Sequence, residues 1–468
     1  MNRIVQSTMA TMALLAFAGV SDGWAADANV PVSDWTGWHI GAGAGYGLLN
    51  HKLDLDVAVD GSGGDGFLAD ATARGLGGQG GLVTLEAGYD FATEGGWLFG
   101  IQADFTLSGM ETNVDVRGSG PGEHINGYLR NAHSFSVLGR AGYLVNDATL
   151  LYLTAGLTRS RFDADTDGLE LLDLPLIDDT VAGFEDGFSA YGVTIGGGVE
   201  NVIADNVTLK FEHRMTLGRD ENLAVFDQDV DGDTHVNATL DAMSATQTIR
   251  AVISYRPGVK AAVLDGSQDK WNSVNAGVGL GYGMLNHELD LGIDDLSAQG
   301  SGIGADGALA SFEVGLDHLI GDRIVVGALA SFTYSGVKSE GGLETTEDAG
   351  GLDVDATLKA SRSFDALARL GLLTGPDVLW YGLAGYTQTR FDLDVSVNSN
   401  DSPQDGLSET RSVGGLTFGG GVEVMLRDNL SWKTEYRYTN YDAEDIIDGI
   451  LEDSVNAQSI RSVISWRF

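Results

Sequence analysis

Two sets of residues in this sequence have the types and spacing that metal binding or catalysis would need. The first set is two runs of alternating aspartates, each followed by a glycine: Asp163, Asp165 and Asp167, and Asp227, Asp229 and Asp231. A calcium loop needs such oxygens around a glycine turn, and also a bidentate glutamate at its twelfth position. The twelfth positions here are Leu174 and Ala238. We therefore expect solvated acidic segments, with weak divalent-cation binding as the minor alternative and no firm metal site.

The second set is the dipeptides Asn50-His51 and Asn286-His287, which hold the only histidines that recur in equivalent surroundings. Nucleophilic catalysis needs a nucleophile and an orienting acid beside the base, and no Ser-His-acid spacing is repeated with these pairs. The glycine-rich run 61–64 also lacks the Lys-Ser/Thr that a phosphate-binding loop requires. We predict structural histidines, no enzyme activity and no cofactor.

Composition narrows the class of protein further. The formal net charge is −40, which excludes a nucleic-acid-binding surface because such a surface needs clustered Lys and Arg. Cysteine is absent, so neither disulfides nor thiolate metal sites can form. Glycine is abundant (67 residues) but proline is scarce (6 residues), whereas disordered chains are usually rich in proline and poor in strand-forming residues.

The N-terminus has the features of an export signal. Arg3 gives a short positive region, an apolar run extends from Met9 to Val20, and a small-x-small site follows at 23–25. The apolar run is too short to cross a bilayer as a helix, which takes about 20 residues. We predict that residues 1–25 are a removed signal peptide.

An internal repeat sets the domain organisation. Residues 35–55 read WTGWHIGAGAGYGLLNHKLDL, and residues 271–291 read WNSVNAGVGLGYGMLNHELDL. Four further matches follow in the same order, ending with QTIRAVISYR at 247–256 and QSIRSVISWR at 458–467. We predict one unit over 26–256, a periplasmic linker over 257–270 and a second unit over 271–468.

Each unit has the period-two pattern of strands with unlike faces. The last strand places Ile460, Ile464 and Trp466 on one face, and Arg461 and Arg467 on the other. A water-soluble sandwich and a membrane barrel share this alternation, but the export signal and the alternation of short turns with long acidic loops favour the barrel. We predict an all-β fold with eight antiparallel transmembrane strands in each unit. Five aromatic residues are the expected interfacial girdle: Tyr143, Tyr152, Trp380, Trp432 and Trp466.

The motifs GGGVE…DN…KFEHR and GGGVE…DN…WKTEYRY, the opening WTGWHIGAGAGYG and the terminal ISWRF resemble the opacity-protein/OmpA-like outer-membrane barrel family. The likeness is greatest to its alphaproteobacterial outer-membrane immunogenic proteins. The resemblance implies location in the outer membrane, among its lipid and lipopolysaccharide, and a terminal aromatic residue, here Phe468, that the barrel-assembly machinery reads. Family members usually carry one barrel, so the tandem duplication is a departure.

The number of barrels decides the expected function, since eight strands enclose a lumen filled by side chains and sixteen leave an aqueous channel. Glycines 41, 43, 45 and 47 share one face of the first strand, which would leave room for long side chains from across a narrow lumen. The side chains expected to fill the two lumina, paired by charge, are Arg140, Glu200, Lys210, Glu212, Arg214 and Arg250, and Arg369, Glu423, Lys433, Glu435, Arg437 and Arg461. We favour two barrels; the alternative is one sixteen-stranded barrel with these residues on a wet pore wall.

The leading expectation is therefore a structural, surface-interaction protein whose barrels anchor acidic extracellular loops toward a host or surface ligand. The first alternative is a general diffusion porin with a preference for cations. The more distant alternative is an outer-membrane lipid-modifying enzyme. Weak calcium or magnesium bridging between the aspartate runs and lipopolysaccharide phosphates is a minor expectation.

Overall fold

The computed structural model describes most of the repeat region. The described residues are 35–61, 67–117, 124–167, 187–219, 221–229, 234–262, 264, 268–293, 296–345, 352–399, 402–403, 406–441 and 455–468. The predicted signal peptide and the last residue of the second aspartate run, Asp231, lie outside these ranges. Within the described part, no helix is both long and apolar enough to cross a membrane.

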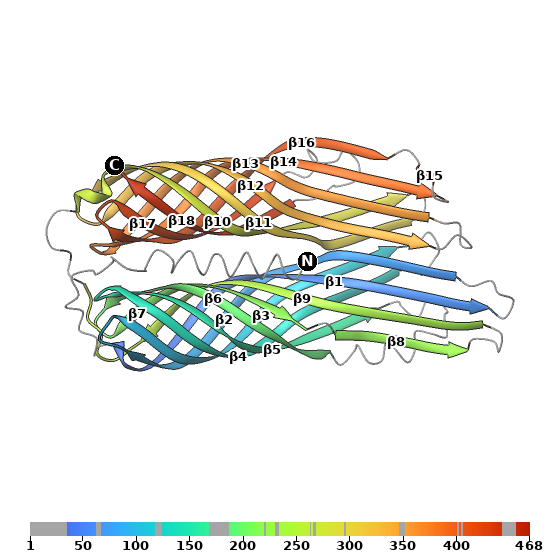
Figure 1. Ribbon diagram of the computed structural model, residues 1–468, viewed down its shortest axis with the longest axis horizontal. Coiled ribbons are helices and arrows are strands. Elements are labelled where there is room, and N and C mark those ends of the chain that lie inside the picture. Colours follow the sequence, from blue (N-terminus) through green and yellow to red (C-terminus); the bar gives the residue numbers. More distant parts are fainter. Residues whose placement is uncertain are drawn as a thin grey trace.

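The first unit is a closed antiparallel barrel (Figure 1). Its strands are β1 (Gly37–Gly61), β2 (Phe67–Ala92), β3 (Trp97–Arg117), β4 (His124–Asn146), β5 (Thr149–Asp167), β6 (Phe188–Ala204), β7 (Val207–Gly218), β8 (Glu221–Asp229) and β9 (Thr234–Tyr255). β7 and β8 pair with successive parts of β9 and together form the seventh strand. β9 then pairs with β1 from Ile40↔Tyr255 onward, which closes the eight-stranded ring.

The second unit repeats this arrangement. A short 3-10 helix, η3 (Asp269–Trp271), leads into β10 (Ser273–Ile293), β11 (Leu296–Ile320), β12 (Ile324–Thr345), β13 (Leu352–Gly375), β14 (Val378–Ser399), β15 (Ser402–Pro403), β16 (Leu407–Arg427), β17 (Leu430–Tyr441) and β18 (Val455–Arg467). β15 only extends the hairpin between β14 and β16. β10 pairs with β18, so the second ring also closes on itself. The prediction of two tandem eight-stranded barrels is confirmed, and the sixteen-stranded alternative is wrong.

The two ends of the barrels differ. At one end short turns such as 93–96 join the strands, and at the other end the strands run far beyond the barrel wall (Figure 1). β1 has 25 residues, whereas a tilted strand crosses a bilayer with about 9–11. Beyond the wall the pairing changes: β2 leaves β3 and joins β12, while β3 joins β11. The strand extensions of the two units are therefore hydrogen-bonded to each other.

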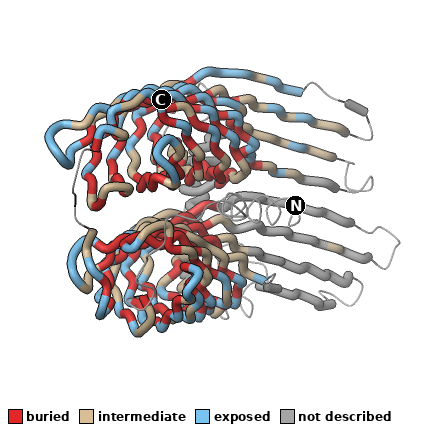
Figure 2. The backbone as a smooth tube through the Cα atoms, turned by 60° about the vertical axis from the view of Figure 1, so that its left-hand side comes forward, coloured by how far each residue is buried: buried red, intermediate tan, exposed pale blue. Residues whose placement is uncertain are grey.

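The polarity of each barrel is opposite to that of a water-soluble protein. Large apolar side chains stand exposed on the outer wall, including Leu85 (63% exposed), Ile101 (58%) and Leu157 (68%). Along the same strands buried residues alternate with exposed ones (Figure 2). Charged and hydroxyl side chains are among the buried residues, which face the interior of the barrel. An apolar exterior with a polar interior is the pattern of a barrel that sits in lipid.

The outer walls of the two barrels also pack against each other. Leu48 and Met215 of the first unit form one buried cluster with Tyr282 and Met284 of the second. Nearer the short turns, the Phe211 and Trp380 rings meet edge to face, with 6.3 Å between their centroids.

Three of the five predicted girdle aromatics have other environments. Trp380 and Trp432 belong to the apolar cluster between the barrels. Tyr152 lies inside the first barrel, because its position on β5 has inward parity, and it donates to Glu212 (2.9 Å). Tyr143 and Trp466 do face outward, and Tyr143 packs on Trp97. The aromatic residues correctly indicated strands, but whether each side chain points to the lipid or to the lumen depends on strand register.

The glycines of β1 face inward, and the nearest atoms beside them are side-chain atoms at Gly41 and Gly47 but backbone atoms of β9 at Gly43 and Gly45. A Cβ atom at Gly45 would lie 2.0 Å from the carbonyl oxygen of Ile249 on β9, and one at Gly43 would lie 2.5 Å from that of Ala251. Gly43 and Gly45 therefore permit the close approach of β1 and β9 at the closure of the ring, while Gly47 makes room for the side chain of Met110 of β3.

Gly45→Ala should lower the free energy of unfolding by about 1–3 kcal/mol, because the added methyl group meets a backbone atom that cannot rotate away. The matched control is Gly81→Ala, since a Cβ atom there has no neighbour within 4 Å. Urea unfolding of both variants in the same detergent checks the prediction. Equal midpoints for the two variants would contradict it.

Candidate functional site: the two barrel interiors

The inner half of each lumen, next to the short turns, is filled by ion pairs. In the first barrel, Arg140 of β4 lies between two carboxylates and is fully buried. It donates to Asp90 of β2 (3.0 Å) and also to Glu200 of β6. Its guanidinium lies 3.9 Å from the centroid of the Tyr152 ring, a cation–π contact. Arg256, just after β9, binds the same two carboxylates at 2.6 Å (Asp90) and 3.3 Å (Glu200).

A second group of ion pairs lies above the first, toward the middle of the wall. Lys210 of β7 pairs with Glu86 of β2, and Arg214 pairs with Glu212 on its own strand. Arg214 also binds Asp104 of β3 (2.5 Å), which Arg250 approaches from β9 at 3.2 Å. The alternation of β7 requires this arrangement, because residues 210, 212 and 214 share its inward face.

Hydroxyl groups close the lumen above the ions. Thr158 of β5 lies within hydrogen-bond distance of Ser136 on one side (3.0 Å) and Thr194 on the other (2.5 Å). Thr194 continues the chain to Thr216 (2.7 Å). In the second barrel Thr417 bridges Thr387 (2.5 Å) and Thr439 (2.7 Å) in the same way.

The second lumen contains equivalent ion pairs at the equivalent positions of the repeat. Arg369 binds Asp317 (3.1 Å) and Glu423, and its guanidinium lies 3.9 Å from the Tyr381 ring centroid. Arg467 binds the same two carboxylates, at 2.8 Å (Asp317) and 2.7 Å (Glu423). The remaining pairs are Lys433 with Glu313, Arg437 with Glu435 and Asp365, and Arg461 with Asp365.

Among the described residues, each lumen holds five carboxylates and five cations, whose charges cancel. The five acids are Glu86, Asp90, Asp104, Glu200 and Glu212 in the first barrel, and Glu313, Asp317, Asp365, Glu423 and Glu435 in the second. The five bases are Arg140, Lys210, Arg214, Arg250 and Arg256, and Arg369, Lys433, Arg437, Arg461 and Arg467. A neutral set is expected because one unpaired buried charge costs several kcal/mol.

One carboxylate has changed strands between the two copies. In the first barrel Asp104 on β3 faces Ser136 on β4 as its cross-strand partner. In the second barrel the equivalent pair is Ser331 on β12 and Asp365 on β13. The acid has moved to the opposite member of the pair, yet it still binds the equivalent two arginines. The number of charges in the lumen is therefore kept while the sequence position is not.

All twelve side chains that the sequence singled out as lumen charges lie inside the barrels and are buried. Sequence reasoning missed the two inward acids of β2, Glu86 and Asp90, and the terminal base Arg256, with their counterparts in the second barrel. A signal for these was present, because LEAGYD and FEVGLD carry the acids at equivalent positions of the repeat, and the repeated segments QTIRAVISYR and QSIRSVISWR both end in arginine. Asp104 and Asp365 gave no such signal, since each aligns with a serine.

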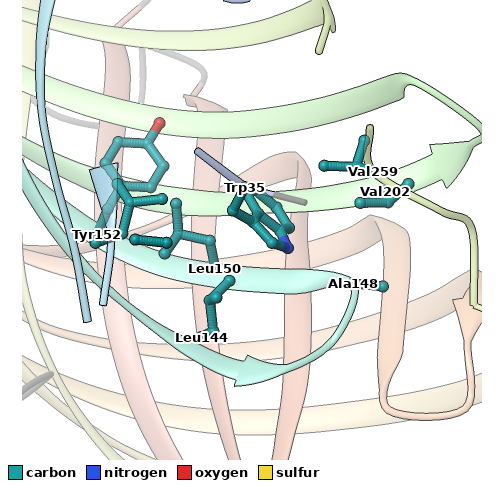
Figure 3. Packing of buried hydrophobic residues seen from close by; sticks show 9 residues of the cluster. Trp35, Leu144, Ala148, Leu150, Tyr152, Val202 and Val259 are labelled. Carbon is teal, nitrogen blue, oxygen red and sulfur yellow. The ribbon is translucent and has the colours of Figure 1, made fainter. Parts of the chain in front are cut away.

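The base of each barrel is covered by a tryptophan. Trp35 is fully buried in a cluster with Leu98, Leu144 and Leu150, and its indole N–H donates to the carbonyl oxygen of Asp147 (3.0 Å; Figure 3). Val259, from the segment after β9, packs on the same cluster. Trp271 of η3 closes the second barrel in the same manner and donates to the carbonyl oxygen of Pro376 (3.1 Å).

The segment predicted as the linker therefore begins docked on the first barrel. Asp205, in the turn between β6 and β7, accepts from the backbone N–H of Ala261 and from Lys260, each at 3.2 Å. Both interactions lower the pKa of Asp205 below its ordinary value of 3.8. Because the folded pKa is the lower one, this contact is present above the ordinary value and is lost as pH falls through the folded pKa.

Asp205→Asn should increase tryptic cleavage after Lys260, because the carboxylate that holds this segment is gone. Asp322→Asn, in the turn between β11 and β12, is the control and should leave the cleavage rate unchanged. Cleavage of the unsubstituted protein near residue 260 by an acid-active protease should also increase as pH falls below 3.8. Unchanged cleavage in Asp205→Asn would show that the contact does not hold the segment.

The other predicted site residues are not brought together. Asp163, Asp165 and Asp167 lie within β5, and Asp227 and Asp229 lie within β8, so neither described run forms the turn of a calcium loop. Asp163 is instead bound by Arg130 (3.1 Å). Among the described residues no group of three or more His, Asp or Glu side chains could hold a metal ion. Asn50 donates to Asp306 of the second barrel (2.7 Å), and both His51 and His287 lie beside a β-bulge.

Comparison of the chain with known proteins matches it to outer-membrane proteins. A family model described as an outer membrane protein beta-barrel domain matches residues 9–243 and again residues 258–468. The chain belongs to this family. It is an outer-membrane protein with two copies of the domain, and the predicted resemblance and location are confirmed.

Relatives within the outer-membrane β-barrel family match one copy at a time. The 31 kDa outer-membrane immunogenic protein of Brucella melitensis is 29% identical over 241 residues, which cover 49% of this chain and 98% of the relative. The 25 kDa outer-membrane immunogenic protein of Brucella ovis is 30% identical over 224 residues (46% and 94%). The 22 kDa outer membrane protein of Rhizobium leguminosarum bv. viciae is 29% identical over 188 residues (40% and 65%).

Solved structures are more distant. The attachment invasion locus protein Ail of Yersinia pestis is 18% identical, with a TM-score of 0.23, and covers 42% of this chain and 99% of its own. The Pseudomonas putida toluene transporter TodX is 14% identical, with a TM-score of 0.22, and covers 91% of this chain and 90% of its own. Scores this low carry no structural argument.

Proposed function

We propose that this protein is a non-conducting surface protein, in which two filled barrels anchor acidic segments outside the outer membrane. The observation that carries the proposal is the pair of neutral ion-pair layers, which occupy each lumen from wall to wall. Among the described residues, two cavities in the lumina are small, one of about 20 Å³ beside Arg214 and one of about 60 Å³ beside Arg461. On this measure a cavity needs about 10–15 Å³ to hold one water molecule, so these two cavities have room for only a few waters.

The distribution of charge supports the same function. Because the ten charges in each lumen cancel, the whole net charge of −40 resides in the rest of the chain. Two segments, 168–186 between β5 and β6 and 442–454 between β17 and β18, each contain six carboxylates and no lysine or arginine. The relatives are named as immunogenic outer-membrane proteins, which suits a protein that exposes segments at the cell surface.

Whole-cell electrophoretic mobility tests where this charge lies. Cells that express the protein should migrate faster toward the anode than cells without it. A variant in which the twelve carboxylates of 168–186 and 442–454 are changed to amides should lose a large part of the difference. The control, Glu94→Gln with Asp322→Asn and Asp428→Asn in the short turns, should retain it. Equal mobility of cells with and without the protein would refute the proposed surface role.

The other candidate functions have less support. A diffusion porin would need a lumen free of the ion pairs, and a lipid-modifying enzyme would need a nucleophile beside a base. The relatives are named as outer-membrane proteins, and their names mention no enzyme activity.

A further inference from the structure

Basic side chains form a patch on the outer wall of the first barrel, just above its apolar zone. Arg159 and Arg161 lie on the outward face of β5, because the alternate residues Thr158 and Ser160 are buried in the lumen. His133 of β4 is the cross-strand partner of Arg161. Arg130 lies one step farther out on β4. These four residues are here called the first basic patch.

The height of this patch corresponds to the outer surface of the membrane. Arg159 lies ten residues beyond Thr149, where β5 begins at the short-turn end. Ten residues rise about 33 Å along a strand, or about 25 Å along the barrel axis at a tilt near 40°. That distance equals the height of the apolar band of an outer-membrane barrel, about 25 Å. The outward side chain directly below Arg159 is Leu157, which is 68% exposed.

The second barrel has a basic patch on the equivalent strands. Arg390 of β14 occupies the repeat position of Arg161, since both stand in an Arg-Phe-Asp sequence. Its cross-strand partner is Arg362 of β13, at the position that His133 holds on β4, and Lys359 follows on the same strand. Arg362 is exposed, and its other neighbour, Tyr334 of β12, is 61% exposed. Lys359, Arg362 and Arg390 are here called the second basic patch.

Both patches are positive in a strongly acidic protein. The first patch has three arginines against two acids, Asp163 and Glu111, which lie opposite Arg130 on the neighbouring strands. The second has three cations against Asp392, which binds Arg390 at 3.0 Å. Ten of the 27 lysines and arginines fill the lumina, and six of the remaining seventeen stand in these two patches. The same placement in both copies is a recurrence that a random scatter of surface bases would not give.

We propose that the two basic patches bind the phosphate groups of a phosphorylated glycolipid in the outer leaflet, of the lipopolysaccharide type. Arginine forms paired, charge-assisted hydrogen bonds with phosphate oxygens. Exposed apolar side chains below the first patch, Leu157 and Phe135, lie where the acyl chains of the same molecule run. Tyr191 stands beside Arg159, whose guanidinium is 5.9 Å from the ring centroid and donates to Ser189 (3.2 Å).

The test compares two double variants of the full chain that carry the same charge change. Arg159→Gln with Arg362→Gln removes one exposed cation from each patch. Lys260→Gln with Arg323→Gln removes two cations at the short-turn end and serves as the control. Both sets of residues are exposed, and heat-modifiable migration on gels checks that each variant has folded. The probe is fluorescently labelled purified lipopolysaccharide, titrated against protein in a non-ionic detergent.

The proposal expects the dissociation constant to rise about tenfold for the patch variant and to stay unchanged for the control. Dephosphorylated lipopolysaccharide should bind the unsubstituted protein about as weakly as intact lipopolysaccharide binds the patch variant. Equal affinity of the two variants would overturn the proposal, as would undiminished binding of dephosphorylated lipopolysaccharide. Binding of inorganic phosphate to the patches as tightly as that of intact lipopolysaccharide would assign the patches to a soluble anion and would also overturn it.

Discussion

A chain carrying Asp104→Ser should unfold about 3–5 kcal/mol more easily than the unsubstituted protein, because the change leaves buried cations without their carboxylate. Asp104 is 2% exposed and binds both Arg214 and Arg250. The second copy of the domain shows how the loss can be compensated. Its carboxylate, Asp365, stands on the strand where the first copy has Ser136. Guanidinium unfolding in detergent, followed by tryptophan fluorescence, measures the effect.

The double variant Asp104→Ser with Ser136→Asp recreates the arrangement of the second barrel and should recover most of the lost stability. The reciprocal pair, Asp365→Ser alone and with Ser331→Asp, provides the matched experiment in the second barrel. Rescue in both barrels would show that the lumen requires a fixed charge count. If each double variant is no more stable than its single variant, charge balance does not govern the packing of the lumen.

Trp271→Ala should lower the stability of the second barrel by about 3–5 kcal/mol, the usual cost of deleting a buried tryptophan. The indole is completely buried, packs on Leu373 and Leu379, and lies 4.9 Å from the guanidinium of Arg467. Its removal opens a cavity at the base of the barrel and leaves the carbonyl oxygen of Pro376 without its donor.

The control for this prediction is Trp38→Ala. Trp38 is 70% exposed on the outer wall and meets Tyr89 edge to face, so its loss should cost at most about 1.5 kcal/mol. Unfolding midpoints of the two variants in the same lipid or detergent give the comparison. A Trp271→Ala chain as stable as Trp38→Ala would mean that η3 does not close the second barrel.

Much of the fold could be predicted because the duplication and the period-two pattern are properties of the sequence itself. Alternation places Lys210, Glu212 and Arg214 on one face, and a barrel in lipid can only turn that face inward. The closure into two rings was also predictable, since the chain between the repeats is longer than a tight turn. These inferences depend on local pattern and on the chemistry of the membrane.

The parts that the sequence did not reveal depend on register and on contacts across the fold. Tyr152 was assigned to the membrane interface, although one step of register places it under Arg140 in the lumen. Asp104 and Asp365 could not be matched by comparing the copies, because the pairing that relates them runs across two strands. The packing of Leu48 against Tyr282, and the pairing of β2 with β12, join segments from different units, and no local sequence pattern indicates which segments of two separate barrels meet.

The central claim is that both lumina are filled, and single-channel conductance of the refolded full chain in a planar bilayer tests it most directly. The ion-pair layers predict an absence of steady current from either barrel across the physiological voltage range. Large, stable, cation-selective steps from the folded protein would contradict this account, since they would require a water-filled path through a lumen that the ion pairs occupy.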